Sequence, residues 1–598
     1  MIKRDKKTYA DGTVKTQIRV VEAYRPGPGL PPKQRTIKDF GYLEDKEDPK
    51  AFMAEAEEFN ARYKTENPPG RIEAPGTEKM YGESNRRFNY GFKFLEAIYT
   101  SLDIDGFIKQ YERSHRFRGD YSLSDIFKFL VVLRLLSPDS KRATCQLKNN
   151  FYNMRTDFTL QEVYRSLDYC ADFDTELQRH LNERVKQLIG RDLTYAFYDV
   201  TNYFFEIDFP EDDDDIRQKG VSKEHRCDPI AAMGLFMDAN GLPVSMSIFP
   251  GNTGETTTLR PVMKDVKESY GLGRIIVVAD KGLNSSKNID AIVNNKDGFI
   301  FSQALRGKKG QRYETELFDE NGWVIRSDRY KYKLFDEEYT GHDENGKKVS
   351  RKRRILLYWD KADAERARRK REEKLRKAEK ALKNNAYAIK HGYEEYTKEE
   401  LVDKESGEYL ENVAKVRSVN REKAEKDAKY DGYFCIITSE LDMDERDIRK
   451  AYKGLWRIEE SFRVMKSDLY ARPVFVRNND HIRAHFLICF VALLVIRVLQ
   501  RKMGEKPLSA ERIARALKAA TCRISKNGIV WLDDVGGMIA FRKTVNEKGE
   551  TVDTLQFSNE DEIALDYRRI QETFGTDFYD VFPKQEVFNK FLKNITVA

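Results

Sequence analysis

The sequence predicts a multidomain α/β protein, and three observations favour this fold class. The chain has 598 residues, which at roughly 100–200 residues per domain suggests three to five domains. Strand-like and helix-like runs alternate over residues 191–305 and again over 432–500, as is typical of an α/β sheet. Before this region, over 76–190, apolar residues recur at helical spacing.

The first two segments differ in their periodicity. Residues 1–75 are predicted to form an N-terminal β unit, because the run Thr16–Tyr24 alternates passably, and contact with DNA is one role for it. Residues 76–190 are predicted to be helical, as in Ser122–Leu136. Basic residues gather near these helices, so the segment is interpreted either as a DNA-binding domain or as a helical packing domain with a solvated face.

The remaining segments follow from changes of pattern. Residues 191–305 are predicted to be the first part of an α/β core, and 432–500 its second part. Between them, 306–431 breaks the pattern with strand-like pieces and a charged helix over Lys361–Leu382, which predicts an inserted domain. Residues 501–598 are predicted to be a mainly helical C-terminal domain without an assignable motif.

Composition excludes several classes of protein. The net charge is only +7, from 106 basic and 99 acidic residues, so a nucleic-acid partner has to be argued from local patches. The six cysteines form no C-x-x-C pair, which disfavours a zinc site or a disulfide framework. The longest apolar run, Phe486–Ile496, is too short to span a bilayer, and the charged start does not look like a signal peptide. We therefore expect a cytoplasmic protein with no membrane partner.

Three acidic residues stand in three settings that suit catalysis. Asp199 interrupts a strand-like run and shares a face with Tyr195 and Phe197, so it should be partly buried. Asp280 ends the apolar run Ile275–Ala279, at the end of a strand where α/β sheets place their chemistry. Buried carboxylates must be paired or bind metal, so each aspartate is a metal ligand or a structural ion-pair partner.

The third acid, Glu459, lies in a predicted helix over Glu445–Ser467. Tyr452, Glu459 and Lys466 are seven residues apart, which in an α-helix places them within roughly 20° per step on one face. Arg463 flanks this face four residues after Glu459. The face offers a carboxylate, two cations and a phenol; the plainer alternative is a solvated helix with a Glu–Arg pair.

With these residues the chain resembles the DDE transposases of bacterial insertion sequences, in the group whose third acid lies in a Tyr-x2-Arg-x3-Glu-x6-Lys signature. Tyr452, Glu459 and Lys466 fall at the signature spacing, whereas Leu455 stands at the arginine position, which leaves the route of second-strand cleavage open. The other matching stretches are Tyr198–Thr201, Phe249–Leu259, Ala279–Gly282 and Arg472–Phe475.

The resemblance implies a ribonuclease H-like catalytic core interrupted by an inserted domain between the second Asp and the Glu. It implies that Asp199, Asp280 and Glu459 are the catalytic residues and hold two Mg²⁺ ions, with Mn²⁺ as substitute. The implied activity is cleavage at the element's terminal inverted repeats and joining of the ends to target DNA. A homodimer on paired ends and a nucleoid-associated location in bacteria are further implications.

Several basic residues are expected to contact this DNA. Arg306–Arg312 is a basic, glycine-containing loop directly after a predicted strand, so it suits a phosphate backbone, although a solvated loop is the alternative. The expected DNA-binding residues are Tyr452, Lys466, Arg463, Lys281, Arg306, Lys308 and Lys309. Two rival functions are a regulator that binds DNA but has lost catalysis, and another ribonuclease H-like nuclease.

Overall fold

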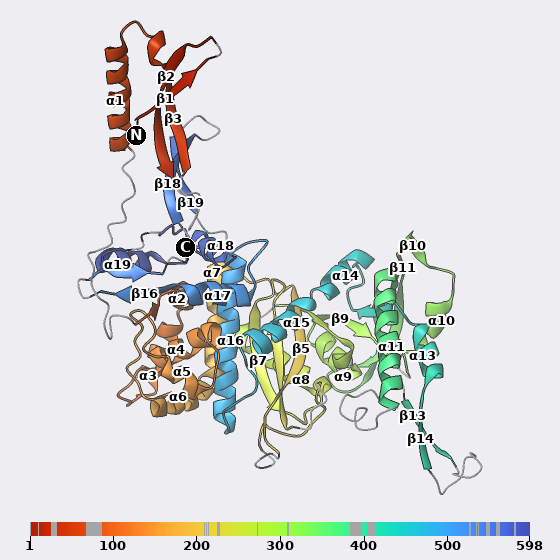
Figure 1. Cartoon of the computed structure of the whole chain (residues 1–598). Coiled ribbons are helices and arrows are strands. Elements are labelled where there is room, and N and C mark those ends of the chain that lie inside the picture. Colours follow the sequence, from red (N-terminus) through yellow and green to blue (C-terminus); the bar gives the residue numbers. More distant parts are fainter. Residues whose placement is uncertain are drawn as a thin grey trace. The chain divides into compact units, whose positions relative to one another are not determined.

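A computed structural model shows how these segments fold (Figure 1). It describes residues 2–597, apart from positions 10, 25–32, 67–85, 209, 211, 213, 224–227, 272, 308–309, 383–396, 403–413, 526–527, 534, 536–537, 546–550, 558–561, 579 and 581. The chain divides into two units. The first unit combines residues 1–87, 519–572 and 577–591, and the second combines 88–518, 573–576 and 592–598. The predicted boundary at residue 75 lies outside the described residues.

The first unit begins with a three-stranded antiparallel sheet, in the order β1 (Ile2–Thr8), β2 (Val14–Tyr24), β3 (Lys33–Tyr42). β2 covers the run that its alternating sequence predicts as a strand. Helix α1 (Pro49–Glu66) packs on this sheet, and Ile18 of β2 is buried with Phe52 and Ala56 of the helix. The segment alternates only loosely because the pairing of β2 with β3 shifts register between Val20 and Val21, and both of these neighbours are buried.

The C-terminal region is mixed rather than mainly helical. Helices α17 (Ala510–Ala519), α18 (Glu562–Thr573) and α19 (Gln585–Asn594) are interleaved with strands β16 (Thr521–Ile524), β17 (Val530–Leu532), β18 (Met538–Val545) and β19 (Thr551–Phe557). β16 pairs with β17, and β18 pairs with β19, both antiparallel. The alternation Leu555-Gln556-Phe557 was a strand signal, but it is too short to stand out beside the longer helical runs.

The second unit opens with helices packed around a later one. They are α2 (Phe92–Ser101), α3 (Ile104–Ser114), α4 (Leu123–Leu136), α5 (Lys141–Gln146), α6 (Leu160–Asp172) and α7 (Asp174–Ile189). Side chains cap them: Ser122 accepts from the N–H of Asp125, and Thr159 forms a capping box with Glu162. Helix α16 (Asn479–Lys502) packs on α2, α4 and α6 and also on strand β7, so it joins the helices to the sheet (Figure 1).

Helix α16 is long and apolar enough to cross a membrane by composition alone. Its most apolar 18-residue window has a mean hydropathy of 2.3, but 89% of that window is buried inside the protein. Phe486, Leu487 and Leu493 are all fully buried. The hydrophobicity of α16 is therefore that of a core helix between two layers.

A nine-stranded sheet forms the rest of the second unit, in the order β10-β11-β12-β15-β9-β8-β5-β6-β7. Its central strands β5 (Tyr195–Phe204), β8 (Ile276–Ala279) and β9 (Gly298–Gln303) are parallel, while β6 (Ile230–Met237) and β7 (Pro243–Pro250) form an antiparallel hairpin beside β5. Residues of helices α8 (Glu255–Tyr270) and α9 (Ser286–Asn294) share the buried core of this sheet. The strands predicted over 191–305 thus belong to a single sheet, and the predicted helices pack on it.

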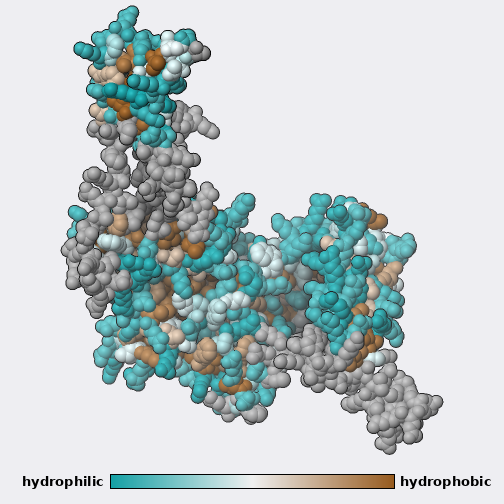
Figure 2. Space-filling view, viewed as in Figure 1, coloured by the Kyte–Doolittle hydropathy of each residue, from teal (hydrophilic) through white to brown (hydrophobic). Residues whose placement is uncertain are grey.

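The segment predicted as an inserted domain contributes to the same sheet. Strands β10 (Val324–Ser327), β11 (Tyr330–His342) and β12 (Lys348–Asp360) continue it as antiparallel neighbours, and β12 pairs with β15 (Tyr433–Thr438). Buried Ile355 and Leu357 of β12 belong to the sheet's own core, which is why this part does not stand apart. Helix α11 (Lys361–Leu382), strands β13 (Thr397–Val402) and β14 (Ala414–Val419), and helix α13 (Arg421–Ala428) follow; the surface over α11 is hydrophilic (Figure 2).

Candidate active site

Asp199 and Asp280 lie side by side at the middle of the nine-stranded sheet. Asp199 is the fifth residue of β5, and Asp280 directly follows β8. The two strands are parallel, with Phe197 opposite Val278. Continuing this register by two residues places Asp199 next to Asp280, on neighbouring strands separated by roughly 4.8 Å. The apolar run before Asp280 predicts that this residue lies at the end of a buried strand, and the sheet places it there.

The two carboxyl groups have opposite pKa shifts. Burial raises the pKa of Asp199 to about 6, and the negative charges of Glu255 and Asp280 add to this rise. The nearby Lys223 ammonium and the N–H of Val200, which donates to Asp199 Oδ1 at 2.8 Å, oppose it. Two neighbouring carboxylates with separated pKa values are typical of a site that handles protons or cations.

Asp280 is held by hydrogen bonds from two other elements. Burial raises the pKa of Asp280, but hydrogen bonds from Ser302, Lys281 N–H and Tyr452, together with the charge of Lys281, lower it below the ordinary value. Ser302 Oγ donates to Asp280 Oδ1 at 2.7 Å, and Tyr452 Oη donates to the same atom at 3.1 Å. The carboxylate is thereby fixed in orientation and stays ionised at neutral pH.

The predicted single helix around Glu459 is broken into three pieces. Helix α14 (Glu445–Lys453) ends before Gly454, α15 (Trp456–Arg463) carries Glu459, and a π-helical turn covers Val464–Asp468. The tight turn at Gly454 and Leu455 is joined by i→i−3 bonds such as Leu455 N–H to the carbonyl of Tyr452. The backbone keeps right-handed helical angles at Gly454, Leu455 and Val464, so the predicted helix over 445–467 is present but irregular. Because these turns differ from 3.6 residues each, the seven-residue spacing does not define one straight face.

Glu459 is not in contact with the two aspartates. Helix α15 packs against β5, but the Glu459 side chain is exposed and, within the described part of the chain, makes no hydrogen bond or ion pair. Across the described residues, no three His, Cys, Asp or Glu side chains are close enough to hold a metal ion. The structure thus brings together Asp199 and Asp280, and places Glu459 on an adjacent helix.

A glycine sets the distance between α15 and the sheet. A methyl group on Gly454 would collide with the ring of Phe197, which is buried on β5 two residues before Asp199. The backbone of the α14–α15 turn therefore lies directly on the strand that carries Asp199. Only glycine allows this approach without moving one of the two elements.

Replacing Gly454 by Ala is expected to lower the free energy of unfolding by about 1–3 kcal/mol, as overpacking of a buried contact does. Urea unfolding of the purified protein measures the change. Gly273→Ala is the matched control, because nothing lies within 4 Å of a methyl group there. The double variant Gly454→Ala/Phe197→Leu should recover stability; equal stability of Gly454→Ala and the wild type would contradict this contact.

Three of the other residues expected to bind DNA contact side chains within the protein. The Lys466 ammonium lies 5.5 Å from the centre of the Tyr203 ring, and Arg463 pairs with Glu460 at 3.5 Å. Arg306 pairs with Asp427 at 3.1 Å. Lys281 is exposed beside Asp280, whereas Lys308 and Lys309 lie outside the described residues. The Tyr452 hydroxyl, for which a phosphate contact is expected, is hydrogen-bonded to Asp280.

A second basic run, Lys347–Arg354, is mostly part of strand β12, and its arginines stabilise the fold. Arg351 pairs with Asp290 of α9, Arg353 pairs with Glu337 of β11, and Arg354 pairs with Asp336 of the same strand. These arginines hold β12 to its neighbours. The run of like charge does not reveal these acidic partners, because they lie outside it, 16 to 61 residues earlier in the chain.

Sequence reasoning missed three polar residues at the site: Glu255, Lys223 and Ser302. Ser302 is the next-to-last residue of β9, which pairs with β8, so strand order brings it to Asp280. Glu255 lies in the stretch Phe249–Leu259 that carries the resemblance, but no role was assigned to it. The signal for both was position, since Ser302 lies near the end of β9 and Glu255 begins α8.

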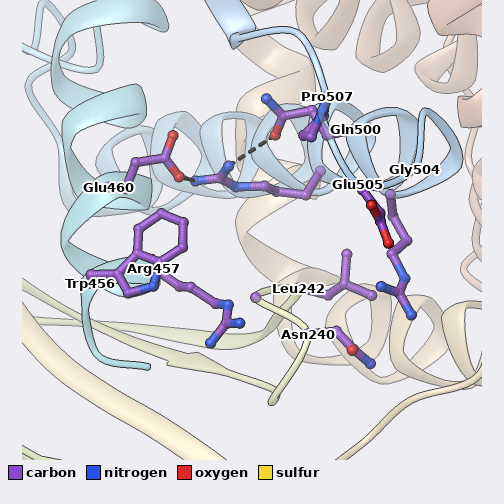
Figure 3. Close-up of a pocket in the computed structure, with 12 residues that line it drawn as sticks. Asn240, Leu242, Trp456, Arg457, Glu460, Gln500, Gly504, Glu505 and Pro507 are labelled. Atoms are coloured by element: carbon purple, nitrogen blue, oxygen red, sulfur yellow. Dashed lines mark hydrogen bonds and ion pairs between the residues drawn. The ribbon is translucent and has the colours of Figure 1, made fainter. Parts of the chain in front are cut away.

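A separate pocket of about 320 Å³ lies on another side of α15 (Figure 3). Trp456, Arg457 and Glu460 line it from α15, and Asn240 lines it from the β6–β7 turn. Arg497 of α16 bridges Glu460 and Gln500, at 2.9 Å from the Gln500 amide oxygen. Asp199, Asp280 and Glu459 are not among its lining residues.

Comparisons with known proteins identify two domains of this chain. The model of the transposase DDE domain matches residues 209–495, which include Asp280 and Glu459 but begin after Asp199. The model of the N-terminal domain of IS1634 family transposases matches residues 2–71. A search of curated proteins finds no match.

Two solved structures are similar only weakly. The piggyBac transposase synaptic complex with hairpin DNA is 9% identical, over 72% of this chain and 78% of that chain, with a TM-score of 0.34. The Mos1 transposase paired-end complex with left transposon end is 11% identical, over 29% and 57%, with a TM-score of 0.13. These scores are too low to carry fold or function over to this chain. The two domain matches are sufficient: the chain is a DNA transposase of an insertion sequence, with a DDE transposase domain and an N-terminal domain of the IS1634 type.

Proposed function

We propose that this transposase binds the terminal inverted repeats of its element, cleaves at the ends and joins them to target DNA by two-metal phosphoryl transfer. The observation that supports this most directly is the pairing of Asp199 and Asp280 on adjacent parallel strands. A ribonuclease H-like core and the Tyr-x2-Arg-x3-Glu-x6-Lys signature, with Leu455 in place of its arginine, are parts of the same proposal.

The donor set suits hard divalent cations. DDE transposase domains generally use divalent metal ions, and carboxylate oxygens are the ligands that Mg²⁺ and Mn²⁺ prefer. Asp199 and Asp280 fit this role. Asp199 is half-buried and has no direct ion-pair partner among the described residues, and Asp280 is ionised and held in place by hydrogen bonds. Glu459 would complete the set from α15. Two bound Mg²⁺ ions would activate a water or a 3′-hydroxyl and stabilise the leaving oxygen.

The protein's own residues have distinct tasks in this scheme. Asp280 is oriented by Ser302 and Tyr452, so its ligand direction is set before a cation binds. Asp199, with a pKa of about 6, is mostly ionised above pH 7 and would be one of the carboxylates that hold the cations. Lys466, Lys281, Arg306 and Arg463 are proposed to hold DNA phosphates together with Lys308 and Lys309.

Assembly and location remain part of the proposal. Two ends have to be brought together before joining, so we infer a homodimer in the synaptic complex. The substrate is chromosomal DNA, so a cytoplasmic, nucleoid-associated protein is expected.

Replacing Glu459 by Gln tests the assignment of the third acid. In Mg²⁺, a plasmid that carries the gene with its native flanking DNA should be cut at the element's ends by the wild type and not by Glu459→Gln. The neutral amide keeps the size of the side chain and removes its charge. Equal cutting by both proteins would show that Glu459 is not a metal ligand. No cutting by either, with intact binding to the flanks, would favour a regulator that has lost catalysis.

A further inference from the structure

A fourth carboxylate reaches the strands that carry the two aspartates. Glu255 is the first residue of α8, which follows the β6–β7 hairpin. A methyl group on Gly282 would lie 2.7 Å from Glu255 Oε2, so this oxygen faces the backbone just two residues after Asp280. The other oxygen, Oε1, lies 2.5 Å from the Lys223 ammonium. The Glu255 carboxylate therefore lies between Gly282, which follows β8, and Lys223, which precedes β6.

Lys223 links the Glu255 carboxylate to Val200, the residue that follows Asp199. Its ammonium donates to the carbonyl of Val200 at 2.5 Å, and Val200 directly follows Asp199 on β5. Lys223 belongs to the connection between β5 and β6, so a residue from a loop contacts both β5 and the start of α8. Both partners of the ion pair are partly open, with 42% of the Lys223 side chain and 34% of the Glu255 side chain exposed.

The electrostatics of Asp199 agree with this geometry. Besides burial, the charges that act on the pKa of Asp199 come from Lys223, Glu255 and Asp280. All three lie close enough to influence one carboxylate, and one of them is a cation. The Lys223 ammonium thus contacts Glu255 and acts on Asp199, and a position between two carboxylates is one that a divalent cation also favours.

We propose that Glu255 is a further acidic residue of the metal site and that Lys223 competes with divalent cations for Asp199 and Glu255. This inference rests on the proposed two-metal function. Entry of a divalent ion displaces the Lys223 ammonium, which frees Glu255 to face the ion directly or through a water. The Lys223 side chain is then available for a phosphate of the bound DNA.

Direct binding of Mn²⁺ to the full-length protein tests the proposal without any cleavage reaction. Electron paramagnetic resonance of free Mn²⁺ measures the dissociation constant. Removing the competing charge in Lys223→Met should tighten Mn²⁺ binding by roughly tenfold. Removing the carboxylate charge in Glu255→Gln should weaken it by about tenfold or more. Matched controls on the exposed part of α8, Lys264→Met and Glu268→Gln, should bind Mn²⁺ like the wild type.

Two outcomes separate this inference from the proposed function. If Asp199→Asn loses Mn²⁺ binding while Lys223→Met and Glu255→Gln bind as the wild type does, Lys223 and Glu255 form only a structural ion pair and the inference is overturned. If Asp199→Asn and Asp280→Asn both bind Mn²⁺ as the wild type does, the metal site itself is wrong. Thermal unfolding of each variant shows that a changed affinity does not come from a loss of folding.

Discussion

Asp280→Asn is expected to lower the rate of cleavage at the element's ends by roughly 10²–10³-fold or more, as loss of a preorganised charged group at a reacting centre does. The amide oxygen of Asn can still accept the hydrogen bonds from Ser302 and Tyr452, so the local fold should persist. What is lost is the negative charge, which a divalent cation requires. The measurement is the initial rate of plasmid cutting in Mg²⁺.

The control for this variant is Asp265→Asn, a change of the same charge on the exposed side of α8. Asp265→Asn should cut at the wild-type rate, and both variants should bind the flanking DNA with unchanged affinity. Cutting by Asp280→Asn at more than about a tenth of the wild-type rate would remove Asp280 from the catalytic set.

Lys141→Met is expected to stabilise the protein, and the gain should depend on pH. Lys141 is only 4% exposed at the start of α5. Burial, with a smaller contribution from the positive charge of Arg134, lowers the pKa of Lys141 from its ordinary 10.5 to about 7. Below pH 7 the folded protein must hold a buried charge, which costs on the order of 3–5 kcal/mol.

The sign follows from proton binding in the two states. Between pH 7 and 10.5 the unfolded chain binds one more proton at Lys141 than the folded chain does, so stability rises with pH across this window. The gain from Lys141→Met should therefore be complete at pH 6 and smaller by roughly 2–3 kcal/mol at pH 9. Urea unfolding at both pH values measures it, with the exposed Lys109→Met of α3 as control. A gain that does not change with pH would mean that Lys141 is neutral or paired at both.

The central strands and the two aspartates could be predicted because their signals are local. The apolar run before Asp280 defines a buried strand, and the aspartate at its end has to emerge at the sheet's carboxyl edge. The alternation of strands and helices likewise defines the parallel part of the sheet. The helices of residues 88–190 were equally clear, since their apolar spacing and caps lie in single continuous segments.

Other features depend on partners that are far apart along the chain. β12 pairs with β15 across α11, β13, β14 and α13, so its place in the central sheet could not be derived from its own charged sequence. The glycine at position 454 is required by its contact with Phe197, more than 200 residues earlier. Glu255 and Lys223 meet only because α8 and the β5–β6 connection converge on the same strand ends.

The free edge of the nine-stranded sheet has a consequence for association. β10 is the last strand, and its four residues are all exposed, including the aliphatic side chains of Val324 and Ile325. An edge strand of this kind presents a row of backbone groups and an apolar surface to any other extended segment. Addition of a strand there would extend the same hydrogen-bonded ladder that continues through β15, β9 and β8 to β5, which carries Asp199.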